Sequence, residues 1–119
     1  MKICSKTLYN KKWSKDNRNV FKKGDKVRIM PFNELLDNPD FVEVNKQNIV
    51  VIKAGDAEIE TCDVDHYLQY ETEEFEVTFV YEKFFKNTID MYNIQQLDRA
   101  EHYGYTPTLI LPAFMLEKV

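Results

Sequence analysis

The chain has 119 residues, of which 44% are hydrophobic and 13% aromatic, and a net charge of −4 from 16 basic and 20 acidic residues. A chain of this size can fold as one compact domain and bury roughly two-thirds of the surface of its unfolded form, without a metal or a disulfide. Its composition excludes collagenous, fibrous and wholly disordered chains. The charge is unevenly distributed. Residues 1–28 carry ten basic and two acidic residues (+8), and the remaining 91 residues carry six basic and eighteen acidic ones (−12).

The first 23 residues are polar and basic and show neither the period of a strand nor that of a helix, so we interpret them as an N-terminal arm. No long apolar run follows this basic start, so no secretory signal is predicted. The longest uncharged stretch, residues 103–116, contains Pro107 and Pro112 and is too short to span a membrane. Cys4 and Cys62 lie far apart in the sequence, and we interpret them as reduced thiols. We therefore predict a soluble, cytoplasmic protein.

Strand patterns begin at the Gly24-Asp25 turn signal. In residues 26–30, Val27 and Ile29 alternate with basic residues, which predicts a half-buried strand, and Pro31 ends it. A short helical turn is expected in residues 32–38. Residues 48–54 form a β-branched apolar run that predicts a second strand, and residues 58–62 alternate again and can pair back across the turn at 55–56.

The clearest strand is predicted at residues 74–82, where apolar and polar side chains alternate over nine residues. Further strands are expected at 89–97 and 105–111, followed by a turn at 112–116 and the chain end at 117–119. The core set is chosen by alternation and strand membership and comprises Val27, Ile29, Phe75, Val77, Phe79, Tyr81, Tyr92, Ile94, Leu109, Leu111, Phe114 and Leu116. Five to six strands with short connections and short helical turns indicate a mainly β fold that closes into a small barrel.

Two short strings of sequence resemble the SH3-like barrels found in many small proteins of phages and mobile elements. Residues 24–29, Gly-Asp-Lys-Val-Arg-Ile, resemble the first strand, and residues 112–119 resemble the 3₁₀ turn and final strand that close such barrels. The resemblance implies an SH3-like barrel at 24–119, a binding role and a host-cytoplasm location for a phage-encoded protein. The sequence departs from the pattern of these barrels at Lys118, where proline is common, and in an inserted acidic segment at 38–73. The resemblance supplies no catalytic residues.

Catalytic and metal chemistry have little support in the sequence. Cys62 and His66 offer two metal-ligand types, but a structural zinc site needs four ligands, and Cys4 and His102 form no second pair. A Cys–His nucleophile needs a setting that lowers the thiol pKa, whereas nine acids and no base occupy residues 56–76. With three glycines in the chain, no phosphate-binding loop is predicted. We expect a protein that is not an enzyme and has no metal or cofactor.

Two binding hypotheses follow from the charge pattern. In the first, the acidic stretch steers the chain toward a basic protein partner, as a phage-type inhibitor or modulator of a host protein would require. Its residues, with two tyrosines as aromatic anchors, are Asp56, Glu58, Glu60, Asp63, Asp65, Tyr67, Tyr70, Glu71 and Glu73. The plain alternative is a solvated acidic loop.

In the second hypothesis, the arm contacts a nucleic acid, because cations contact phosphates while aromatic rings stack on bases. The residues are Lys11, Lys12, Trp13, Lys15 and Arg18. The alternative is that the arm pairs with the chain's own acidic segment. The sequence predicts no oligomeric state.

Overall fold

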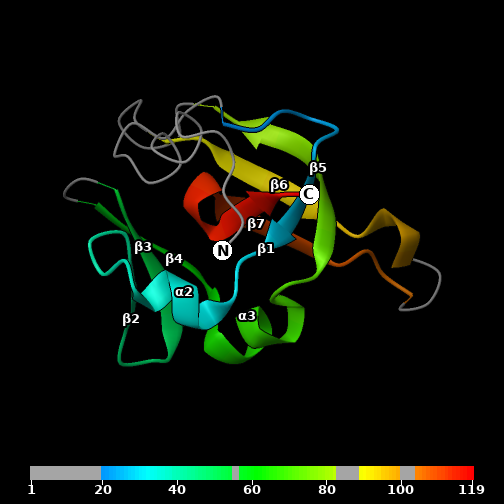
Figure 1. The fold of residues 1–119 in the computed structure, drawn as a ribbon. Coiled ribbons are helices and arrows are strands. Elements are labelled where there is room, and N and C mark those ends of the chain that lie inside the picture. The colour runs from blue at the N-terminus through cyan, green and yellow to red at the C-terminus, as the bar shows by residue number, and fades with distance from the viewer. Residues whose placement is uncertain (1–19, 55–56, 83–88, 100–103) are drawn as a thin grey trace.

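The described residues form two antiparallel β-sheets and two short helices (Figure 1). The structure is a computed structural model that describes residues 20–54, 57–82, 89–99 and 104–119. The strands are β1 (Lys26–Ile29), β2 (Val42–Val44), β3 (Ile49–Ala54), β4 (Ala57–Asp63), β5 (Glu74–Tyr81), β6 (Met91–Gln95), β7 (Thr108–Pro112) and β8 (Leu116–Lys118). The helices are α2 (Phe32–Leu36) and α3 (Val64–Tyr70), with 3₁₀ turns η1 (Leu97–Arg99) and η2 (Ala113–Met115). The prediction of a mainly β fold is confirmed.

The larger sheet has the strand order β7-β6-β5-β1-β8, and the smaller one has the order β2-β3-β4. The first strand therefore lies between β5 and the last strand, β8, which follows the 3₁₀ turn η2. The described strands do not close into the expected barrel, because β7 and β8, at the two ends of the order, are not hydrogen-bonded to each other.

The segment 38–73 contains all three strands of the second sheet and was predicted only in part. The strands β3 and β4 pair as the sequence indicates, although the turn at 55–56 lies outside the described residues. The prediction missed β2, which has three residues, and α3. A signal for α3 is present, since Asp63 caps its first turn by accepting a hydrogen bond from the His66 N–H at 2.7 Å. Val64, Tyr67 and Tyr70 then recur at helical spacing.

Two predicted core residues of β5, Phe79 and Tyr81, are exposed, at 53% and 37%. The cause is a β-bulge between Val77 and Phe79, which places one extra residue, Thr78, on β5 relative to β6. Because successive side chains point to opposite faces, an extra residue exchanges the inward and outward positions beyond it. Val80, opposite the buried Tyr92, accordingly packs against the core instead. The prediction for Phe79 and Tyr81 is wrong for this reason.

The other ten predicted core residues are buried. One hydrophobic cluster joins both sheets and α3. Ring contacts cross between the parts of the fold: Phe41, just before β2, meets Phe114 of η2 at 5.3 Å between ring centroids, and Tyr70 of α3 meets Phe75 of β5 at 5.7 Å. The two sheets therefore share one core.

Candidate functional site

The structure divides the acidic stretch of residues 56–76 between two separate places. Glu58 and Glu60 lie on β4, followed by Asp63 at the cap of α3 and Asp65 in its first turn, and all four side chains are exposed. We call these four residues the β4–α3 acidic face. Neither β4 nor α3 contains a lysine or arginine. Within the described residues, none of the four forms an ion pair.

The other described acids of the stretch contact neighbouring parts of the fold. Glu71 accepts a hydrogen bond from the Phe32 N–H at 2.7 Å and so anchors the start of α2. On β5, Glu74 pairs with Arg28 at 3.2 Å and Glu76 with Lys26 at 2.7 Å, both across the β1–β5 register. Two basic residues of the first 28 thus neutralise two acids of the stretch. Asp56 lies outside the described residues.

The two tyrosines expected to contact a partner are core residues. Tyr67 has no exposed surface, and its hydroxyl donates a 2.6 Å hydrogen bond to the Met30 carbonyl. Burial raises the pKa of this hydroxyl far above its usual value, so it stays protonated. Tyr70 is 3% exposed and packs its ring against Phe75 and His66. Their position on the inward face of α3 makes the expectation of surface anchors wrong.

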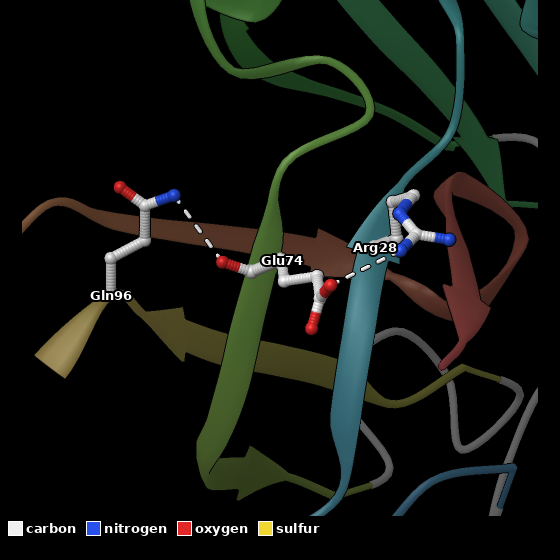
Figure 2. Close-up of polar contacts among 3 residues, drawn as sticks. All are labelled: Arg28, Glu74 and Gln96. Carbon is white, nitrogen blue, oxygen red and sulfur yellow. Dashed lines mark hydrogen bonds and ion pairs between the residues drawn. The ribbon is translucent and has the colours of Figure 1, made fainter. Parts of the chain in front are cut away.

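Gln96 joins the end of β6 to β5, as Figure 2 shows together with the Arg28–Glu74 pair. It is 4% exposed, and its Nε2 donates to Glu73 Oε1 at 2.8 Å and to the Glu74 carbonyl at 3.2 Å. These two acceptors fix the orientation of the amide, because the reverse orientation would place the Gln96 Oε1 against the Glu73 carboxylate and the Glu74 carbonyl oxygen. Its Oε1 is then turned away from both and has no hydrogen-bond partner among the residues that the structure describes. The Glu73 carboxylate therefore accepts a hydrogen bond within the fold, from Gln96.

A groove of about 480 Å³ borders the β4–α3 acidic face and lies between the two sheets. One side is formed by β4 and α3, and the other by β6 and β7. Its apolar lining includes Ile59, Met91, Leu109 and Ile110, and its polar lining includes Cys62 and His66. Sequence reasoning did not find this groove, because its walls come from strands that are distant in the sequence and carry no motif.

Cys62 and His66 thus border one groove, but the setting does not favour a nucleophile. Burial raises the pKa of the Cys62 thiol, and the charge of Asp63 raises it further, while a contact with Thr61 acts in the opposite direction. The thiol is protonated near neutral pH and is a weak nucleophile. Among the described residues, no three histidine, cysteine or acidic side chains are placed to hold a metal ion.

The basic arm residues Lys11, Lys12, Trp13, Lys15 and Arg18 lie outside the described residues. The chain enters the described part at Val20 and Phe21, whose N–H groups both donate to the Tyr92 hydroxyl at 3.2 Å. The arm is therefore joined to a fixed point on the five-stranded sheet.

Comparisons with known proteins give no match to a protein-family profile, to a curated protein or to a solved structure. In the described part of the chain, neither helix has the length and apolar character needed to cross a membrane.

Proposed function

We propose that this protein is a non-catalytic binding protein that engages a basic surface of a protein partner through the β4–α3 acidic face. The supporting observation is the contrast between the two groups of acids. Those on β5 form ion pairs with basic residues of β1, whereas none of the four on β4 and α3 forms an ion pair within the described residues. Lys53 of β3 lies opposite Glu58 in the register but pairs with Glu43 instead. A surface patch of one charge attracts a partner of opposite charge and raises the association rate.

An inhibitor or modulator of a host protein, as encoded by phages, is the specific role that we propose. The SH3-like resemblance belongs to the same proposal, with the five-stranded sheet as an open form of such a barrel and residues 38–73 inserted. Support comes from β1, which pairs with the final strand directly after a 3₁₀ turn. The protonated thiol of Cys62 supports a role without covalent catalysis.

The test is affinity purification of partners from a cell lysate with the wild-type chain and with a variant that neutralises the acidic face. The substitutions are Glu58→Gln, Glu60→Gln and Asp65→Asn. Asp63 is left unchanged because it caps α3. We expect the recovered partner to be basic and to be lost from the variant, and its binding to weaken as salt rises.

A matched control removes the same number of acids elsewhere on the surface. The control substitutions are Asp37→Asn, Asp40→Asn and Glu117→Gln. This control should retain the partner. Equal loss from both variants would show that net charge alone matters, and equal retention would show that the β4–α3 acidic face is not the binding surface.

A further inference from the structure

The groove beside the β4–α3 acidic face is bordered by two strands that each have one unpaired edge. Among the described strands, β4 pairs only with β3, and β7 pairs only with β6. Residues of both β4 and β7 line the groove. An edge strand presents backbone N–H and C=O groups that an added extended segment can pair with. The groove therefore offers hydrogen-bonding partners for a strand on either side.

The side chains of the groove match an extended segment with one apolar face. Ile59 is half-buried and supplies apolar surface for the side chains of such a segment, whereas Leu109 and Met91 are buried and form the floor of the groove. Ile110 also lines the groove and is 43% exposed, so it has apolar surface left to bury. The other face of the segment would point away from the groove lining and meet the solvent and the neighbouring acids.

The charges around the groove favour a basic segment over a second copy of this chain. Glu60 lines the groove, and Glu58, Asp63 and Asp65 are exposed on the same two elements. If β4 of a second copy paired with this β4, glutamates would lie near glutamates, and like charges across strands are destabilising. A lysine- or arginine-containing strand meets no such repulsion.

We propose that the groove binds an extended, basic peptide segment of the partner protein, which adds as a strand to β4 or β7. This inference rests on the proposed function and specifies how the partner is held. Backbone hydrogen bonds to the strand edge supply affinity, the apolar lining selects the inward side chains, and the acidic face selects basic residues on the outward side.

The first experiment uses a synthetic peptide of alternating lysine and valine, about eight residues long to match an ordinary strand. Binding is measured by calorimetry with the full chain, and backbone amide exchange is followed by NMR. We expect slower exchange along β4 or β7 in the complex. Two further peptides carry N-methyl groups on alternate residues, one set for each edge, and so lose the donors on that edge. At least one of them should lose binding.

The second experiment changes the groove wall. Ile110→Lys puts a positive charge into the apolar lining and should weaken peptide binding about tenfold or more. Leu36→Lys on α2 is the control, because Leu36 is exposed to a similar extent, 45%, and does not line the groove. Thermal unfolding of both variants verifies that each is folded.

The inference is overturned if the parent peptide does not bind, if both N-methylated peptides bind like the parent, or if Ile110→Lys binds normally. It is also overturned if light scattering shows that a second copy occupies the groove and that Ile110→Lys dissociates it. A protein partner that depends on the acidic face but ignores Ile110→Lys would leave the proposed function standing without strand addition.

Discussion

At the scale of single residues, two buried polar side chains connect the elements of the fold. Tyr67 ties α3 to the end of β1 through the Met30 carbonyl, and Gln96 ties the end of β6 to β5 through Glu73 and the Glu74 carbonyl. A buried hydrogen-bonding group left without its partner costs more than the net value of the bond itself. Both residues therefore allow sharp tests of the structure.

Replacing Tyr67 by Phe leaves the Met30 carbonyl without its donor and should lower the free energy of unfolding by about 1–3 kcal/mol. Urea denaturation measures this change. Tyr105→Phe is the control, because Tyr105 is 55% exposed and water can replace any partner of its hydroxyl. Equal stability of the two variants would contradict the buried bond.

The same residue predicts how stability depends on alkaline pH. The folded protein holds the Tyr67 proton above pH 10, the ordinary pKa of tyrosine, whereas the unfolded chain releases it. The unfolded state then binds fewer protons, so stability falls as pH rises, by up to about 1.4 kcal/mol per unit for this group. Tyr67→Phe should show a shallower decline above pH 10, and an unchanged slope would count against the raised pKa.

Gln96→Glu places a buried carboxylate beside the carboxylate of Glu73 and the Glu74 carbonyl. Such an uncompensated charge should destabilise the protein by about 3 kcal/mol at neutral pH. Burial and the like charge raise the pKa of the new carboxyl, so the penalty is present above that pKa and decreases as the pH falls through it. Urea denaturation at two pH values measures this. Gln69→Glu, on the exposed side of α3, should change stability little at either pH.

At the scale of the elements, the bulge in β5 determines which residues face the core. The alternation of Phe75, Val77, Phe79 and Tyr81 predicts one uniform face, but the shift in register at Thr78 ends that face after Val77. Thr78 and Asn93 support the bulge, since Asn93 Nδ2 donates to Thr78 Oγ1 at 2.8 Å. The strand itself was predictable from local pattern, whereas the bulge depends on how β5 pairs with β6.

Substitutions of two phenylalanines of β5 test whether the strand contains the bulge or alternates without interruption. Phe75→Ala, at a residue that is 2% exposed, should cost about 3–5 kcal/mol. Phe79→Ala, at a residue that is 53% exposed, should cost less than about 1 kcal/mol. Thermal or urea unfolding compares them. Similar losses at both positions would mean that the alternation continues through the strand without a bulge.

At the scale of the whole molecule, the two sheets share one hydrophobic cluster, to which β3 contributes Val50 and Ile52 and β6 contributes Tyr92 and Ile94. A shared core couples the unfolding of its parts. The most protected amides of β3 and β6 should therefore exchange with the same free energy and the same dependence on denaturant. Native-state hydrogen exchange measures both. Earlier opening of β2, β3 and β4 would show that the smaller sheet is an independent unit.

The charge distribution is also decided at this scale. The sequence alone predicts a basic beginning and an acidic remainder, and leaves open whether these parts pair with each other. The structure pairs Lys26 with Glu76 and Arg28 with Glu74, because β1 and β5 are neighbours in the sheet. The acids of β4 and α3 form no ion pair among the described residues, and in the proposed function they contact a partner.

The sequence by itself determined the mainly β class, most strand positions and ten of the twelve predicted core residues, because these follow from short-range alternation and turn chemistry. The burial of Tyr67 and Tyr70 has a local signal in the helical spacing of α3, which the strand-based prediction did not use. Only the tertiary structure decided that Phe79 is exposed and that β4 and β7 border one groove. These features depend on which strands pair and in which register, and such long-range contacts leave no signal within a short stretch of sequence.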